Sequence, residues 1–259
     1  MEPAKILKII LPLILLVVIF QLVSSQPESE SGEFTFSNTI DLRGVDISEA
    51  EIKINAGSLA LTAHGSPSLE LRANFTRESW RPEMEMDQGS GRLSVYQPEG
   101  KFNNMEDEDH NNWEINFPKN LETNLKLSMG AGEGIIDLSE SKLKSMQIEA
   151  GAGSFDINLA NNSLSRLDVN AGVGELNLDL SGKQEKDLEV NINGGVGAIK
   201  LTLPNQTGVR VSVNGLGGID ANDLIKKDGY YVNDSYGKTS ESIEVEINGG
   251  LGSVELSLE

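Results

Sequence analysis

Residues 125–159, LKLSMGAGEGIIDLSESKLKSMQIEAGAGSFDINL, hold two copies of one pattern placed 21 residues apart. Each copy centres on a Gly-Ala-Gly triplet, at 130–132 and at 151–153. The triplet returns, with Val or Leu in its middle position, at 172–174, 195–197, 215–217 and 250–252. Weaker copies stand at Asn55-Ala56-Gly57 and Gly89-Ser90-Gly91. A fixed period is typical of stacked repeats, so the sequence predicts up to about eight units from Glu33 onward.

Apolar and polar residues alternate around each glycine triplet, which is the pattern of a half-buried strand. Leu167, Val169 and Ala171 share one face, while Asp168 and Asn170 share the other. Each unit is therefore predicted to be two short strands joined at a glycine corner, because a tight bend favours a residue without a Cβ. One unit cannot bury its apolar face alone, so neighbouring units must stack around a shared core.

The predicted fold is all-β: a single-stranded β-solenoid, like a β-helix, with a period near 21 residues, preceded by one hydrophobic N-terminal helix. Four valines are expected at equivalent core positions in successive rungs: Val169, Val190, Val211 and Val245. Asparagines before the glycines are expected to form a hydrogen-bonded ladder, interrupted at 149–151: Asn55, Asn170, Asn193, Asn214 and Asn248. An antiparallel hairpin sheet remains an alternative, because Asn-Gly is also the preferred two-residue hairpin turn.

The chain divides into four predicted parts. Residues 1–26 form a signal anchor or signal peptide and residues 27–33 a linker. Residues 34–128 are expected to form the N-terminal rungs and a cap with a long acidic loop, continuous with the regular glycine-corner repeats of 129–259. A cap protects the open edge of a terminal rung from pairing with another chain. The insertion between the last two triplets is expected to project from one corner.

The N-terminal segment determines the expected location. Ile9 to Phe20 is apolar except for Pro12, short for a full span but suited to targeting. Positive charges precede it, at Lys5 and Lys8, and the positive-inside rule then places the rest of the chain outside the cytoplasm. We expect a single-pass protein of the cell membrane with its C-terminal domain outside, or a secreted protein if the signal is cleaved.

The composition excludes some functions. The chain has 259 residues, with 40 Asp or Glu against 21 Lys or Arg, and a net charge of −19. Such acidity argues against a nucleic-acid partner, whose binding depends on clustered Lys and Arg. The absence of cysteine removes disulfides, thiol catalysis and zinc-thiolate sites.

Few residues suggest a specific chemistry. A candidate partner-binding loop lies in the long insertion and carries Lys226, Lys227, Tyr230, Tyr231 and Tyr236. The acidic run 106–110 offers oxygen ligands but lacks the alternating spacing of a calcium loop, so a solvated loop is favoured. His64 and His110 are the only histidines and hence the main candidates for a general base, and neither accompanies a nucleophile motif. We therefore predict no catalytic, cofactor-binding or metal-binding residues.

Four sequons are candidate glycosylation sites if the chain passes through an N-glycosylating export pathway. They are centred on Asn74, Asn161, Asn205 and Asn233.

The quoted stretch resembles the toast-rack family, the stacked-β ectodomains of bacterial and archaeal envelope proteins. The closing segments GYYVNDSYG (229–237) and IEVEINGGLGSVELSL (243–258) share this likeness, which covers most of residues 55–259. The family also includes C-terminal domains of cell-wall-stress response proteins and adhesin-like surface proteins. The resemblance implies a non-enzymatic role in sensing, binding or scaffolding, with no catalytic residues to carry over.

These observations together predict an exported, membrane-tethered, non-enzymatic β-solenoid ectodomain. Its expected partners are the membrane, through the N-terminal segment, and an envelope protein or polymer, with no nucleic acid. An exported glycan-active enzyme and a surface adhesin remain the alternatives.

Overall fold

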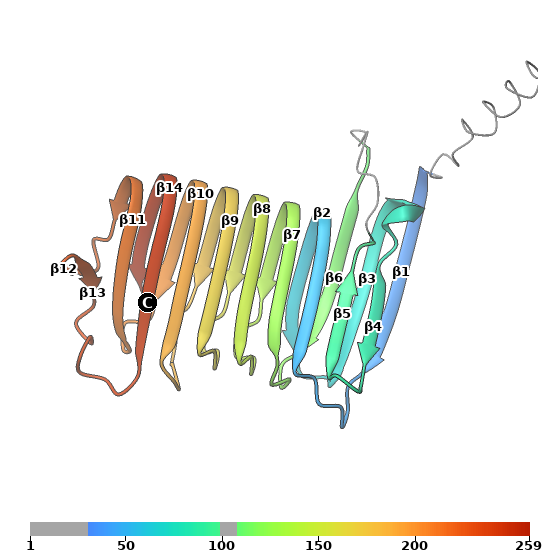
Figure 1. Cartoon of the computed structure of the whole chain (residues 1–259), viewed down its shortest axis with the longest axis horizontal. Coiled ribbons are helices and arrows are strands. Elements are labelled where there is room, and N and C mark those ends of the chain that lie inside the picture. Colours follow the sequence, from blue (N-terminus) through green and yellow to red (C-terminus); the bar gives the residue numbers. More distant parts are fainter. Residues whose placement is uncertain (1–30, 99–107) are drawn as a thin grey trace, which may run out of the picture.

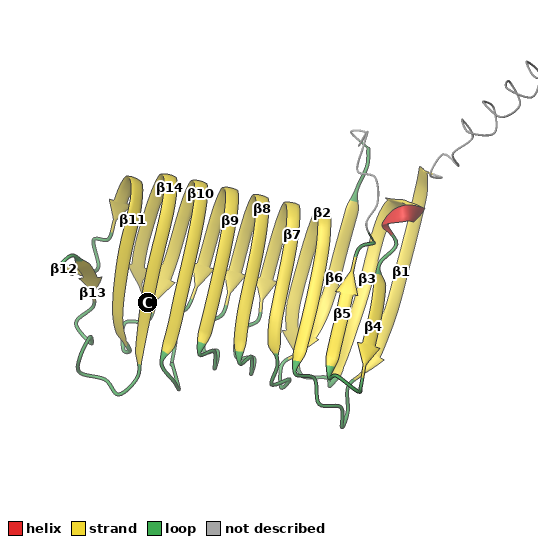
Figure 2. Ribbon diagram, in the orientation of Figure 1, coloured by secondary structure: helices red, strands yellow, loops and turns green. Residues whose placement is uncertain are grey.

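The computed structural model describes residues 31–98 and 108–259, and almost all of its regular structure is β-strand (Figure 2). The strands are β1 (Ser31–Asp41), β2 (Glu49–His64), β3 (Ser68–Arg77), β4 (Glu83–Asp87), β5 (Arg92–Tyr96), β6 (Asn111–Pro118), β7 (Asn124–Asp137), β8 (Ser145–Asn158), β9 (Arg166–Asp179), β10 (Leu188–Leu203), β11 (Gly208–Asp220), β12 (Ile225–Lys227), β13 (Tyr230–Val232) and β14 (Ser242–Leu258). The only helical element within these residues is a 3₁₀ turn, η1 (Glu78–Trp80). The predicted all-β class is confirmed.

The described ranges contain no helix long and apolar enough to cross a membrane. The predicted hydrophobic N-terminal helix lies outside the described residues, as do the signal segment and most of the linker.

The strands belong to one open, 14-stranded sheet. Its order is β1-β3-β6-β2-β7-β8-β9-β10-β14-β11-β13-β12, with β5 pairing with β2 and β4 beside that path. The seven long central strands, from β2 to β11 in this order, pair in parallel. Antiparallel pairs occur towards both ends, in β1-β3-β6 and in β11-β13-β12. The hairpin-sheet alternative is therefore wrong for the glycine repeats.

Each long central strand turns over near its middle, so the sheet is folded along one edge (Figure 1). We call this fold line the ridge, and we call the opposite edge, where turns join the strands, the base. One residue of each central strand stands at the ridge in register with its neighbours. In spatial order these ridge residues are Ala56, Ala131, Ala152, Val173, Val196, Leu251 and Leu216.

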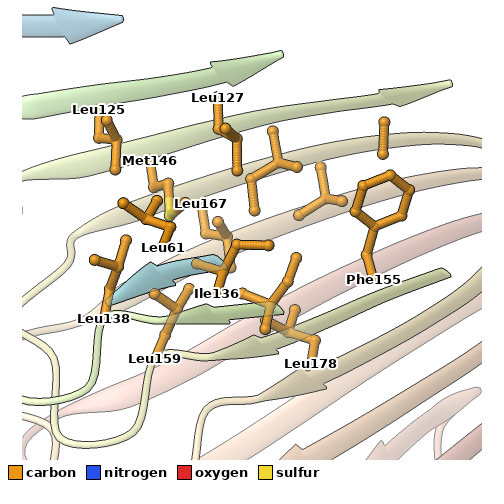
Figure 3. Packing of buried hydrophobic residues seen from close by; sticks show 14 of the residues in the cluster. Leu61, Leu125, Leu127, Ile136, Leu138, Met146, Phe155, Leu159, Leu167 and Leu178 are labelled. Carbon is orange, nitrogen blue, oxygen red and sulfur yellow. The ribbon is translucent and has the colours of Figure 1, made fainter. Parts of the chain in front are cut away.

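The two halves of the folded sheet enclose the hydrophobic core. In β7, Leu125 and Leu127 are buried before the ridge and Ile136 is buried after it. Figure 3 shows such side chains from the two halves filling the space between them, with Leu138 and Leu159 on the side opposite Leu125. Six of the seven central strands alternate in this way, and β11 does so only before the ridge. The core therefore runs along the stack, as expected for repeats that cannot bury their apolar faces alone.

Glycine is required beside the ridge because adjacent backbones approach too closely for a Cβ. Gly153 has φ +146°, and a Cβ there would lie 1.7 Å from the carbonyl oxygen of Gly132. On the other side of the ridge residue, a Cβ on Gly151 would lie 2.0 Å from the carbonyl oxygen of Gly130. Glycine is therefore required at the ridge for two reasons: some positions have a positive φ, as expected, and a Cβ would also clash with the backbone of the neighbouring strand.

The base holds the length differences between repeats. Asn124 lies beside Ser145 and Ser145 beside Arg166, each pair 21 residues apart. Arg166 then lies beside Glu189, 23 residues later, and the two extra residues are accommodated in the base turn before β10. Repeats of unequal length can therefore keep their glycines aligned at the ridge.

The predicted alignment of the four valines is confirmed for Val190, Val211 and Val245 and is wrong for Val169. Val190 lies beside Leu167, and Val169 lies beside Ile192, because the two-residue lengthening shifts the register. The strand order also differs from the sequence order: β14 lies between β10 and β11, so Val245 separates Val190 from Val211. All four side chains are nevertheless buried.

The predicted asparagine ladder is confirmed for four of its five members. In spatial order these are Asn170, Asn193, Asn248 and Asn214. Their side-chain amides are linked by three hydrogen bonds of 2.9, 3.4 and 3.2 Å. The ladder stops at Glu149, beside Asn170, as expected. Asn55 does not belong to it, because it lies at the level of Gly130 and its amide donates to Pro98 instead.

The first part of the described chain departs from the repeat. Gly89-Ser90-Gly91 is not a ridge triplet but lies in the turn between β4 and β5. Trp80 and Trp113 are both buried in the core at this end. The antiparallel strands β1 and β3 continue the sheet beyond β6, so the glycine corner is not repeated there.

Candidate binding surfaces

The long insertion after β11 forms a small hairpin at the end of the stack. Its strands β12 and β13 pair with each other, and β13 pairs with β11 at Arg210 and Val211 only. The insertion was expected to project from a corner, whereas the hairpin extends the sheet past β11 (Figure 1). Among the described strands, none pairs with the outer edge of β11 from Ser212 to Asp220.

The hairpin brings together four of the five residues predicted for a partner-binding loop. Lys226 stands opposite Tyr231, and Lys227 stands opposite Tyr230. The Lys226 ammonium lies 5.2 Å from the centre of the Tyr231 ring, within cation–π range. Tyr236 follows in the next turn and is partly buried, with its backbone N–H donating to the carbonyl of Asn233.

Arg210 of β11 also belongs to this cluster, although the sequence pattern did not single it out. Its guanidinium lies 4.6 Å from the centre of the Tyr230 ring and forms an ion pair with Glu244 of β14. The hydrogen bond to Glu244 raises the pKa of Arg210 above its ordinary value. No sequence signal placed Arg210 beside the hairpin, because this contact depends on long-range strand order.

The ridge carries a second surface that sequence reasoning missed. Val173, Val196, Leu251 and Leu216 are 58%, 51%, 59% and 74% exposed, and we call these four residues the apolar crest. The first three ridge residues are alanines, so the ridge side chains become larger towards β11. The available signal was the middle residue of the glycine triplet, which changes from Ala to Val and then to Leu.

The residues on both sides of the crest are uncharged over β10, β14 and β11. On one side lie asparagines of the ladder, and on the other lie Ala198, Ser253 and Gly218. Only Val173 has a charged residue beside it, Glu175. In a chain with a net charge of −19, this neutral and apolar strip stands out from the rest of the surface.

Among the described residues, the apolar cavity nearest the crest is smaller than an ordinary ligand pocket. An apolar cavity of about 50 Å³ lies beneath the ridge, lined by residues such as Leu176, Ile199 and Gly249. Small-molecule sites usually enclose roughly 300 to 1,000 Å³ and contain a few converging polar groups. A wider hollow of about 350 Å³ borders the outer face near Arg166, whose guanidinium is already paired with Asp168 and Glu189.

The two histidines and Asp109 of the acidic run have structural partners. His64 Nε2 lies 2.9 Å from the carbonyl oxygen of Ser68, and His110 Nε2 lies 3.4 Å from a Glu33 carboxylate oxygen. Asp109, from the acidic run, forms an ion pair with Arg77. Residues 106 and 107 of that run lie outside the described residues. Within the described ranges, no three His, Cys, Asp or Glu side chains are grouped to hold a metal ion.

The four sequons differ in accessibility. Asn74, Asn161 and Asn205 are exposed. Asn233 is buried at the base, where its Nδ2 donates to the carbonyl oxygens of Thr207 and Pro204 and its Oδ1 accepts from the Val209 N–H. A glycan on Asn233 would have to displace these bonds, so the folded structure presents only the other three side chains.

Comparison with protein families gives a match over more than half of the chain. Residues 28–166 and 150–202 match the family model described as the N-terminal domain of toast_rack, DUF2154. Comparison with curated protein sequences gives no match.

Two crystal structures illustrate the similarity to solved folds. A "putative cell adhesion protein" from Clostridium sporogenes ATCC 15579 aligns with a TM-score of 0.68 and 26% identity, over 88% of this chain and 100% of that chain. A "putative adhesin" from Bacteroides fragilis NCTC 9343 aligns with a TM-score of 0.46 and 14% identity, over 86% of this chain and 97% of that chain.

Proposed function

The chain belongs to the toast-rack family, and we propose that it works as a rigid, non-enzymatic binding domain held at the outer face of the cell membrane. The N-terminal segment is the proposed anchor, with the domain outside the cytoplasm; if the segment is cleaved, the domain is secreted. The stacked repeats are the proposed coils of a β-solenoid. They supply a stiff frame, and the proposed partner is an envelope protein or polymer, with no role for nucleic acid.

The observation that carries this proposal is the aromatic and basic cluster at the end of the stack. Lys226, Lys227, Tyr230 and Tyr231 lie on two paired strands, and Arg210 of β11 adjoins them. Tyrosines with nearby cations can stack on a partner and form hydrogen bonds with it. Because β13 is paired with β11, the frame holds these side chains in fixed positions, which lowers the entropic cost of binding.

A role in adhesion is a variant of this proposal. The similar Clostridium sporogenes structure is described as a putative cell adhesion protein, which supports a surface role without naming a ligand. A glycan-active enzyme is the competing proposal. The small size of the apolar cavity and the structural partners of the two histidines favour binding over catalysis.

Capture from intact cells tests the binding proposal. The full chain would be expressed with Lys226→Glu and Lys227→Glu, and surface partners would be recovered by cross-linking. The control is Lys142→Glu with Lys144→Glu, because these lysines are exposed at the base and the change in net charge is the same. We expect capture to fall only in the hairpin variant. Equal capture by both variants would reject the hairpin as the binding surface.

Two further measurements address location and chemistry. External protease applied to intact cells should cleave the domain, and a fully protected chain would reject the proposed orientation. Hydrolysis of envelope glycans that is abolished by one carboxylate substitution would overturn the non-enzymatic proposal and favour the glycan-active enzyme.

A further inference from the structure

We propose that the apolar crest rests on the lipid bilayer that holds the N-terminal segment, so that the ridge faces the membrane and the base faces away. This inference depends on the membrane tether of the proposed function and adds an orientation to it. The proposed contact is with uncharged lipid: the bilayer interface receives Val173, Val196, Leu251 and Leu216.

The strand directions place the start of the described chain at the ridge end of the sheet. In β6, Asn112 pairs with Ser58, next to the ridge of β2, and Pro118 pairs with His64 at the base. β3 runs antiparallel to β6, and β1 runs antiparallel to β3. β1 therefore begins at the ridge end, at Ser31, and reaches the base at Asp41.

The length of chain before Ser31 limits how the domain can stand. The apolar segment ends at Val23, which leaves seven residues, 24–30, before β1. Seven residues reach at most about 25 Å when fully extended. β1 contains 11 residues and spans about 35 Å, so the linker is too short to pass along it and let the base approach the bilayer. The tether therefore keeps the ridge end of β1 on the membrane side.

Charge and exposure then identify the contacting strip. The crest exposes four large apolar side chains in register on adjacent strands, about 4.8 Å apart. Over β10, β14 and β11, both flanking rows are uncharged, so contact along these three strands requires no desolvation of an ionised group. The acidic remainder of the chain repels anionic lipid, which favours a zwitterionic surface. A weak contact is sufficient, because the tether raises the local concentration of the membrane.

The absence of cysteine makes a direct test practical. The full chain would be reconstituted in phosphatidylcholine vesicles with one introduced cysteine carrying an environment-sensitive fluorophore. Leu251→Cys reports the crest and Asn205→Cys reports the exposed base. We expect lipid-borne quenchers to remove most of the emission at position 251 and little of it at position 205.

Charge variants separate the crest contact from the tether. Val196→Glu with Leu216→Glu should abolish quenching at position 251 while the protein still floats with the vesicles. The control is Asn205→Glu with Gln206→Glu, which adds the same charge at the exposed base and should leave quenching unchanged.

Three outcomes would overturn the proposal. Flotation without quenching at position 251 would mean that the tethered domain keeps its crest off the bilayer. A blue-shifted label that lipid quenchers do not reach, and that depends on protein density, would assign the crest to a second copy of the chain. If the unsubstituted protein does not float with the vesicles, the proposed membrane tether is wrong. This result differs from failure of the crest contact, in which the protein floats but the label at position 251 is not quenched.

Discussion

The ridge and the base are two edges of the same folded sheet, and they differ in how much sequence change they accommodate. At the ridge, every triplet is held to the same length by glycines such as Gly151 and Gly153, which lie against the backbone of the next strand. At the base, the turns range from short links to the long insertion that carries β12 and β13. Register at the ridge is therefore kept where backbones touch, except that β11 has one residue fewer than β14 between Asn214 and Leu216, while most length variation lies at the base.

Polar side chains also interact differently at the ridge and at the base. The ladder near the ridge consists of exposed asparagines that bond to one another, such as Asn193 to Asn170. At the base, buried polar side chains such as Asn162 and Asn233 satisfy backbone carbonyl groups of the turns. We expect the buried group to contribute more to stability, because its loss leaves unpaired groups away from water.

The largest expected effect comes from inserting the same two residues at the two edges. Gly-Ser inserted between Gly151 and Ala152 would move Gly153 out of level with the glycines of both neighbouring strands. We expect no folded protein, or a loss of at least about 4 kcal/mol in the free energy of unfolding. The same insertion between Glu185 and Lys186, exposed in a base turn, should cost less than about 1 kcal/mol. Urea unfolding followed by circular dichroism compares the two, and equal tolerance would contradict the contrast between the edges.

A single methyl group at the ridge should be nearly as disruptive. Gly153→Ala places a Cβ 1.7 Å from a backbone oxygen at φ +146°, so we expect a loss of about 3 to 5 kcal/mol. Gly44→Ala is the matched control: its φ is +72° but no atom lies within 4 Å of the added Cβ. It should therefore show only the conformational cost, about 1 kcal/mol. Similar losses in the two variants would mean that φ alone, and not contact between strands, explains the ridge glycines.

At the base, Asn233→Ala should destabilise the domain by about 2 to 3 kcal/mol. The substitution leaves the carbonyl of Thr207 and the N–H of Val209 without their partner in a buried site. Asn205→Ala provides the control, since it removes an exposed side chain from the same turn region and should change stability by less than about 0.5 kcal/mol. Chemical denaturation measures the free energy of unfolding of both variants. An Asn233→Ala variant as stable as the unsubstituted protein would show that water replaces the amide.

The smallest expected effect is at the ladder. Asn193→Ala removes its hydrogen bond to Asn170 and interrupts the row, but the amides are exposed and water can replace them. We expect a loss of about 0.5 kcal/mol in the same unfolding assay. A loss as large as that of Asn233→Ala would show that the ladder, and not only the glycines, fixes the ridge.

The sequence was sufficient to predict the repeat but not the order of its strands. Gly-x-Gly triplets and strict alternation are local signals, so the corners, the buried faces and most of the ladder could be predicted. The place of β14 between β10 and β11 could not, because Val190, Val211 and Val245 have nearly identical surroundings in the sequence. Strands with the same local pattern do not encode which neighbour they take.

The candidate surfaces show the same limit. The basic and aromatic composition of the insertion identified Lys226 and Tyr230, whereas the contribution of Arg210 depends on pairing across the sheet. The apolar crest was overlooked because Val196 and Leu251 occur inside glycine triplets, which were interpreted only as turns. Their exposure follows from the fold at the ridge, which is a three-dimensional feature.

The position of β14 has a consequence for the order in which the domain assembles. Val211 of β11 pairs with Val245 of β14, which leaves the ribosome 34 residues later. At about 5 to 20 residues per second, β11 waits roughly two to seven seconds for its parallel partner. During this interval the exposed edge of β10 offers β11 a similar ridge sequence, Asn-Gly-Gly-Val-Gly, to pair with. We therefore expect the final step of folding to be the entry of a late strand between two earlier ones, and growth by simple addition at one end cannot complete this domain.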